Sequence, residues 1–372
     1  MERDCDVLVC GASFAGLAVA RELAGSGARV LVIDRYEIGE RQTSACAMPT
    51  EWLAALELMG SWRQSFDELV VHTPIHTSRW RLPWSFSTFD YGELCALLWE
   101  QSAAGAEVEF ETATVTAREG FTVHTDRGAL RSPLIVDALG WRRVLSNGQP
   151  IQPPNAPMSR GLEVHPRGRG AEMELWVDPR YIRAGYGWSF PAEDELRVGI
   201  GSFWPTHHVK EPTVRLAQEL ELPASGYQGN WIPHALRDAT EDDIFFVGDS
   251  AGHCLPLTAE GIRTALYFGL ACGRELRAVL AGASTRELAL SRYGAFSDSH
   301  ARKYRWLLNA QRAVGQITPS RAMTAIVRGF ESRRLAGWVF GRYLAIAPPS
   351  FVGAGPRPRF LRARRPAAVV PS

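Results

Sequence analysis

Lysine is almost missing from this sequence. Lys210 and Lys303 are the only two, so arginine supplies the other 39 of the 41 basic residues. This shortage excludes any mechanism that needs a lysine elsewhere in the chain. The six cysteines, at positions 5, 10, 46, 95, 254 and 272, show neither CxxC nor another paired-ligand spacing. We therefore predict no metal site and no disulfide framework.

An excess of one charge and long apolar runs are missing as well. The 41 basic and 40 acidic residues nearly cancel, which argues against nucleic acid as a partner. No stretch of about 20 residues is apolar enough to span a bilayer. The opening MERDCDV is charged where a signal peptide needs an apolar run. We expect a cytoplasmic protein.

What is present is the composition of a folded chain of two or three units, with 372 residues of which 46% are hydrophobic. Its N-terminus has the order strand, tight turn, helix, strand. The turn GASFAG is the βαβ dinucleotide fingerprint, in which an acid closing the second strand, here Asp34, accepts from ribose hydroxyls. The turn contributes Gly11, Ser13, Phe14, Ala15 and Gly16, with Ser13 in place of the usual middle glycine. Arg35 is either a surface charge or a stacking partner for adenine.

A second acid follows a short apolar strand far downstream. DIFFVG ends at Gly248, Asp249 comes next, and strong helical periodicity runs from about Gly261 to Leu276. An acid at the carboxyl end of a strand beside a helix N-terminus can bind the ribitol hydroxyls of a flavin. Asp249 as a simple helix N-cap is the alternative.

Together, GASFAG, Asp34 and GDSAGHCLPLTAEGI resemble the FAD-dependent group that includes aromatic hydroxylases and geranylgeranyl reductases, over roughly residues 5 to 275. The resemblance implies an α/β fold, in which a glutathione-reductase-type Rossmann domain binds FAD, carries an inserted antiparallel β-sheet substrate domain and is followed by C-terminal helices. It implies that Gly11, Ser13, Gly16, Asp34 and Asp249 hold the adenosine, pyrophosphate and ribitol. It also implies that Pro256, Gly261 and Ile262 lie near the flavin ring.

The run YGWSFP, followed after seven residues by GIG, is similar to the YxWxFP…GxG motif of the geranylgeranyl reductases. The resemblance implies a substrate cavity beside the flavin. Tyr186, Trp188 and Phe190 alternate along a strand and share one face. A stripe that only fills a sheet core is the alternative interpretation. The substrate contacts we predict are Tyr186, Trp188, Phe190, Pro191, Gly199, Gly201 and Trp231.

Within the group, NAD(P)H-using hydroxylases carry an Asp-Gly pair where this chain has Asp137-Ala-Leu-Gly140. The broken pair weakens the hydroxylase interpretation and leaves the electron donor open between NAD(P)H and a reduced carrier, including an electron-donor protein. Flavin-dependent halogenases use an active-site lysine. Because the first lysine is Lys210, a halogenase with that lysine in its N-terminal half is excluded.

The loop after the second strand resembles the one that passes over the flavin and often carries an Arg and a Cys. Arg41 could contact the flavin phosphates, and Cys46 could face the isoalloxazine; an inert buried cysteine is the alternative. His253 is the titratable group best placed to donate a proton. A structural histidine is its alternative interpretation.

We divide the chain into an FAD domain in three parts (1–65, 92–150, 236–280), a substrate-domain excursion (66–91), the substrate domain (151–235), a helical region (281–350) and a disordered basic tail (351–372). The run after residue 280 predicts one long amphipathic helix. Residues 337–353 either pack internally, close the cavity or touch a membrane surface, and the five-arginine tail could attract anionic lipid.

The sequence thus predicts an FAD-dependent oxidoreductase that reduces carbon–carbon double bonds of an apolar isoprenoid or polyene. The alternative is an FAD monooxygenase that hydroxylates or epoxidises an apolar or aromatic molecule, because fold does not fix chemistry. Binding of flavin or lipid without turnover is the third hypothesis.

Overall fold

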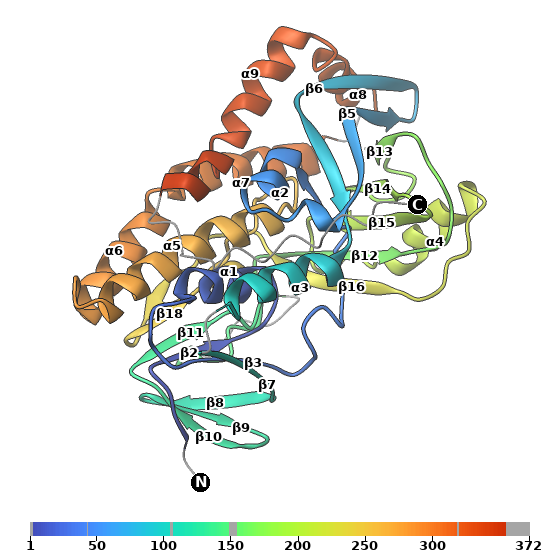
Figure 1. Cartoon of the computed structure of the whole chain (residues 1–372). Helices are drawn as coiled ribbons and strands as arrows, with labels where there is room; N and C mark the ends of the chain where they lie inside the picture. Colours follow the sequence, from blue (N-terminus) through green and yellow to red (C-terminus); the bar gives the residue numbers. More distant parts are fainter. Residues whose placement is uncertain (1–2, 43, 105–106, 149–154, 318–319, 355–372) are drawn as a thin grey trace, which may run out of the picture.

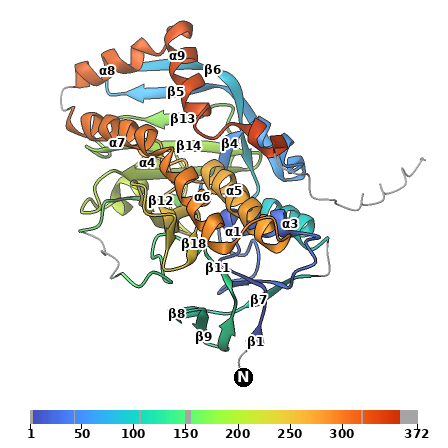
Figure 2. The same ribbon diagram turned by 90° about the vertical axis from the view of Figure 1, so that its left-hand side faces the viewer.

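The computed structural model describes residues 3–42, 44–104, 107–148, 155–317 and 320–354. Most of the predicted basic tail lies outside these ranges, as do residues 149–154 around the predicted boundary between the FAD domain and the substrate domain. The described chain forms three tiers, visible in two perpendicular views (Figures 1 and 2): a small sheet, a Rossmann layer and a large sheet covered by C-terminal helices. Among the described residues, no helix is both long and apolar enough to cross a membrane.

The Rossmann layer is a six-stranded sheet in the order β17-β18-β11-β2-β3-β7, parallel except at the edge strand β17. Its strands are β2 (Val7–Cys10), β3 (Val30–Asp34), β7 (Val108–Thr112), β11 (Leu134–Asp137), β17 (Thr240–Glu241) and β18 (Ile244–Phe246). The parallel strands are apolar and almost fully buried, as expected for a sheet with covered faces.

Helices α1 (Phe14–Leu23) and α5 (Ile262–Leu280) pack closely on this sheet. Glycines set the distance between them, because a Cβ on Gly269 would lie 2.6 Å from the carbonyl oxygen of Ala15. The helices α3 (Tyr91–Ser102) and α6 (Arg286–Asp298) flank the pair (Figure 2). The N-termini of α1 and α5, about 250 residues apart in the sequence, therefore lie side by side.

The five strands between α3 and residue 137 divide between two sheets. β8 (Val115–Glu119), β9 (Thr122–Thr125) and β10 (Gly128–Arg131) form a small four-stranded sheet with β1 (Arg3–Asp4), while the flanking β7 and β11 join the Rossmann sheet.

The large sheet has eight strands in the order β16-β12-β15-β14-β13-β5-β6-β4. These are β4 (Ala47–Pro49), β5 (Trp62–Thr73), β6 (His76–Phe89), β12 (Met158–Val164), β13 (Met173–Trp176), β14 (Gly185–Ala192), β15 (Glu195–Ser202) and β16 (Gln228–Pro233). All neighbours are antiparallel except β13 and β5, which run parallel. β5 begins at Trp62, before the position where the sequence places the substrate-domain excursion.

One face of this sheet packs on α4 (Lys210–Glu219), and the other faces the Rossmann layer. The expected long C-terminal helix is two helices, α6 and α7 (Ala301–Gln316), separated at Ser299 and His300. α8 (Ser320–Gly329) and α9 (Arg333–Leu344) lie along β5 and β6 (Figure 1). The short elements are α2 (Thr50–Ala55), η1 (Met59–Ser61), η2 (Gly248–Ala251) and η3 (Pro349–Ala354).

Candidate functional site

The glycine turn after β2 is closed by backbone contacts that leave no room for a side chain. Gly11 has a φ of +115°, and a Cβ there would lie 2.3 Å from the carbonyl oxygen of Ala138. A Cβ on Gly16 would lie 1.8 Å from the carbonyl oxygen of Gly11. Only glycine allows the chain to turn at Gly11 and α1 to start this close to the strand.

The N-terminus of α1 is left open for an anion. Ser13 is its N-cap residue, but the Ser13 side chain makes no capping hydrogen bond and its first turn carries no acidic side chain. Instead, the Ser13 Oγ accepts a hydrogen bond from the Tyr91 hydroxyl at 3.3 Å. The partial positive charge of the helix end is therefore available to a pyrophosphate.

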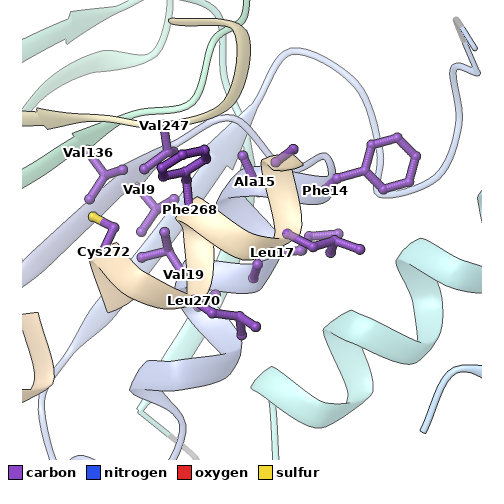
Figure 3. Close-up of a cluster of buried hydrophobic side chains, with 14 of the residues drawn as sticks. Val9, Phe14, Ala15, Leu17, Val19, Val136, Val247, Phe268, Leu270 and Cys272 are labelled. Atoms are coloured by element: carbon purple, nitrogen blue, oxygen red, sulfur yellow. The ribbon is translucent and has the colours of Figure 1, made fainter. Parts of the chain in front are cut away.

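Phe14 and Ala15 leave this helix end in different directions, as Figure 3 shows. The Phe14 ring makes edge contacts with Phe89 and Tyr91, at centroid distances of 6.3 and 5.4 Å. Ala15 faces Gly248, where a Cβ would lie 2.9 Å from the Ala15 Cβ. The start of α1 is thus in contact with the segment that carries the second predicted acid.

Asp34 connects the end of β3 to the glycine turn. Its carboxylate accepts hydrogen bonds from the backbone N–H groups of Ala12 at 2.8 Å and Tyr36 at 3.1 Å. Arg35 and Arg41 both lie over the Tyr36 ring, 4.8 and 5.1 Å from its centroid, and Arg41 also donates to the Tyr36 hydroxyl. The two arginines give this edge of the site a positive charge.

Asp249 lies in η2, between the starts of α1 and α5. Its Oδ1 is 3.8 Å from the position of a Cβ on Gly261, the N-cap residue of α5. Desolvation raises the pKa of Asp249 to about 6, opposed by Arg237. Hydroxyl donors from a ligand would relieve this desolvation. Buried Pro256 precedes the turn into α5, and Ile262 is the first residue of that helix.

These residues fit FAD. The turn excludes side chains where a pyrophosphate must approach, the α1 end has no side-chain cap, and the Asp249 carboxyl lies in protein surroundings that disfavour its charge. The elements that carry the fingerprint and the second acid meet at one edge of the sheet, the carboxyl ends of β2, β3 and β18. Open α/β sheets bind their ligands at that edge.

A wall of aromatic side chains on the large sheet faces this edge. The Tyr186 hydroxyl donates to the carbonyl oxygen of Thr258, in the loop before α5, at 2.5 Å. The Trp188 ring lies 6.1 Å from that of Tyr186. A Cβ on Gly199 would lie 2.3 Å from Trp188 Cζ2 and 2.6 Å from the carbonyl oxygen of Leu162, so this glycine makes room for the indole and for the neighbouring strand β12.

Comparisons with known proteins agree with this geometry. Residues 4–123 match the family described as FAD binding domain. Digeranylgeranylglycerophospholipid reductase 3 from Methanosphaera stadtmanae is 25% identical over 337 residues, which cover 81% of this chain and 84% of that protein. The chain is a relative of the geranylgeranyl reductases. It is an FAD-dependent oxidoreductase, as the motifs predicted.

Solved structures show the same fold. A geranylgeranyl bacteriochlorophyll reductase-like protein from Thermoplasma acidophilum superposes with a TM-score of 0.79 at 16% identity, covering 95% of this chain and 99% of that one. A p-nitrophenol 4-monooxygenase from Pseudomonas putida superposes with a TM-score of 0.72 at 15% identity, covering 93% and 99%. The fold is therefore common to reductases and monooxygenases, and the choice between them rests on the site.

Two predicted substrate contacts of this reductase relative lie off the aromatic wall. Pro191 follows Phe190 on β14 and so points to the opposite face, where its Cγ would lie 2.7 Å from a Cβ on Gly170. Trp231 pairs in register with Arg160, whose guanidinium carbon lies 4.8 Å from the indole centroid. Strand alternation explains both departures, because the register of β16 cannot be read from the sequence and only one face of β14 reaches the site.

His253 lies in the core between η2, α5 and α6. Its ring stacks on Phe268 at a centroid distance of 3.7 Å, and its Nε2 is 3.1 Å from Ser297 Oγ. Burial lowers the pKa of His253 well below its usual value, so the ring is neutral. This geometry supports the structural alternative, and we assign His253 no proton transfer.

Cys46 is fully buried at the start of β4, with a φ of +50°. Burial raises the pKa of its thiol, and Arg197 opposes the shift only in part. The thiol therefore stays protonated near neutral pH, which argues against a thiolate nucleophile. Its predicted position facing the flavin stays a prediction.

Asp137, in the broken Asp-Gly motif, is a buried hydrogen-bond acceptor that connects β11 to neighbouring segments. Its buried carboxylate accepts hydrogen bonds from the backbone N–H groups of Leu139 and Leu145, both at 2.9 Å, and from the Ser250 hydroxyl at 2.6 Å. Asp137 thus fixes η2, and with it Asp249, relative to β11.

Sequence reasoning missed the charged residues on the aromatic face. Arg197 donates to the carbonyl oxygens of Ala45, Cys46 and Phe89, at 2.8, 3.2 and 2.9 Å, and so joins the large sheet to the loop before β4. The signal was available, because Arg197 is spaced two residues from Gly199 and must share its face. Buried Glu163, opposite Gly199 on β12, gave no signal of its own.

Proposed function

We propose that this protein uses FAD to reduce a carbon–carbon double bond in an apolar isoprenoid or polyene. The observation that carries the proposal is the aromatic wall. In it, Trp188 packs against glycines, and Tyr186 is hydrogen-bonded to the loop that leads into α5. The wall offers a long apolar molecule area to contact beside the FAD edge. NAD(P)H or a reduced carrier, including an electron-donor protein, would supply the electrons.

The chain's own residues hold the cofactor in this proposal. The α1 N-terminus binds the pyrophosphate, Asp34 binds the adenosine ribose and Asp249 binds the ribitol chain. The N-terminus of α5 supplies positive potential beside Gly261. When bound and reduced, FAD supplies the hydride.

The aromatic wall acts by positioning and by excluding water. An unactivated alkene has no polar group that hydrogen bonds could orient. The rate of its reduction therefore depends on how well the wall holds the alkene in one pose. The faces of Trp188 and Tyr186 also stabilise positive charge that develops on carbon as protonation proceeds. The hydrogen bond from Tyr186 to Thr258 keeps the wall in register with the start of α5.

Product analysis tests the proposal. The chemically reduced flavoprotein is incubated with prenylated lipids and polyenes, and the masses of the products are measured by mass spectrometry. A gain of two hydrogens supports the proposal, whereas a gain of one oxygen in air identifies a monooxygenase.

Two variants separate the wall from the fold. Trp188→Ala should lower turnover far more than FAD content, and Trp231→Ala, off the wall, should lower neither. Equal effects of the two substitutions would contradict the role given to the wall.

A further inference from the structure

A row of titratable side chains crosses the large sheet on the same face as the aromatic wall. The side chain of Glu163, on β12, contacts Trp188 on β14. His165 follows Glu163 by two residues. Glu163 Oε1 is 3.0 Å from His165 Nε2. His165 Nδ1 is 3.5 Å from Glu195 Oε1 and is hydrogen-bonded to Gln228 Nε2 at 3.2 Å. Arg197 Nε donates to the same Glu195 oxygen at 2.8 Å.

The row goes from solvent to the interior. The side chain of Glu195 is 35% exposed, that of His165 is 7% exposed and that of Glu163 is 3% exposed. Each consecutive pair lies within 3.5 Å. Such a graded series is the arrangement that moves protons between water and a buried site.

The inner pair is not satisfied by the protein. Although Glu163 Oε1 and His165 Nε2 approach to 3.0 Å, neither atom makes a hydrogen bond of acceptable geometry with the described residues. Leaving a buried carboxylate oxygen or imidazole nitrogen unpaired is costly, and such groups in a native structure call for an explanation.

The inner end of the row touches the aromatic wall. Glu163 Oε2 accepts a hydrogen bond from Trp188 Nε1 at 3.1 Å. Glu163 and Arg197 also act electrostatically on Cys46, which places the carboxylate near the loop over the predicted FAD position. The inner end of the row therefore reaches the indole of the aromatic wall, against which the proposed substrate would be held.

We propose that Glu163 and His165 form a proton relay that supplies the second hydrogen of alkene reduction, refilled from solvent through Glu195. This proposal rests on the proposed function. The double bond takes a hydride on one carbon, which brings both electrons from reduced FAD, and a proton on the other. The π bond breaks, two C–H bonds form, and the proton lost from the relay is replaced from water.

Glu163→Gln tests the relay, because glutamine keeps an oxygen acceptor for Trp188 Nε1 but cannot deliver the proton. The reduced variant is mixed anaerobically with the alkene that wild type reduces, and flavin reoxidation is followed. We expect a loss of about 10²-fold or more, the usual contribution of general acid catalysis. In heavy water, the remaining rate should fall more for the variant than for wild type.

Three further readouts separate proton delivery from structure: FAD content and reoxidation by oxygen should stay at wild-type values, and the melting temperature of the apoprotein should fall only slightly, because glutamine keeps an acceptor for Trp188 Nε1. Glu174→Gln is the matched control, since Glu174 forms a 2.9 Å pair with His72 on the opposite face of the same sheet. It should change none of the rates.

The outcomes are distinguishable. If wild type reduces no alkene, the proposed function fails and the relay with it. If wild type reduces the alkene and Glu163→Gln does so equally fast, the relay alone is wrong. A variant that loses FAD, oxygen reactivity and thermal stability together with alkene reduction shows a structural role and also overturns the relay.

Discussion

Gly199→Ala should disrupt the aromatic wall while leaving the FAD site intact. The new Cβ would lie 2.3 and 2.6 Å from two indole carbons of Trp188 and 2.6 Å from the carbonyl oxygen of Leu162. The indole must shift to relieve the first two contacts, and because the Leu162 oxygen belongs to the β12–β15 pairing, relieving the third must also displace the strand locally.

The expected cost has two parts. Overpacking of a filled site costs about 1–3 kcal/mol. Moving the indole also breaks the hydrogen bond from Trp188 Nε1 to Glu163, and a bond to a charged group contributes about 1.5–3 kcal/mol. Because relaxation offsets part of this sum, we expect a loss of roughly 2–5 kcal/mol in the free energy of unfolding.

Gly201→Ala is the matched control on the same strand and face. Its Cβ would lie 3.4 Å from Trp188 Cζ3, an ordinary contact, so we expect a change below about 1 kcal/mol. Urea unfolding of the apoproteins measures both changes, and alkene turnover and FAD content are measured on the holoproteins. Turnover should fall far more for Gly199→Ala than for Gly201→Ala, with FAD content near wild type for both. Equal stability and turnover of the two variants would refute the packing argument.

Three further predictions concern the cofactor site. Gly16→Ala should abolish FAD binding, because its Cβ would lie 1.8 Å from a backbone oxygen. Gly341→Ala on α9 is the control and should keep FAD, because no atom lies within 4 Å of the new Cβ. Flavin retained by the Gly16→Ala variant would contradict the turn geometry. Asp249→Asn should weaken FAD binding yet stabilise the apoprotein. The folded pKa of Asp249 is about 6, above an unfolded value near 4, so its charged form destabilises the fold increasingly as pH rises from about 4 to above 6. The substitution should therefore add about 2–3 kcal/mol at pH 8 and almost nothing at pH 4 in thermal unfolding, and a gain independent of pH would be inconsistent with this cause. Finally, the buried Cys46 thiol should react with iodoacetamide only as fast as the protein unfolds, and rapid alkylation of the native protein would show a reactive thiolate.

The cofactor half of the site was readable from the sequence because it is built from local patterns. The turn around Gly11 and Gly16 requires glycine for backbone reasons, and an acid at the end of a strand is visible in the chain itself. Asp249 needed only the knowledge that parallel strands end at one edge of a sheet.

The substrate half depended on register, which the sequence did not provide. Tyr186 and Trp188 alternate visibly, but Pro191 and Trp231 were predicted as substrate contacts without knowledge of which face each would take. Glu163 became visible only when β12 was placed beside β15, since the pairing of distant strands sets that neighbour. His253 was predicted as a proton donor because it is close to Asp249 in the sequence. That closeness does not show that the His253 ring points into the core.

The most direct test of the account is an anaerobic mixing experiment on the full chain. Chemically reduced flavoprotein is mixed with a polyprenyl lipid in the absence of oxygen, and the flavin absorbance near 450 nm, roughly where oxidised flavins absorb, is recorded. We predict that the oxidised spectrum returns at a rate that depends on lipid concentration, with one double bond lost for each flavin reoxidised. A spectrum that stays reduced until oxygen is admitted would contradict alkene reduction.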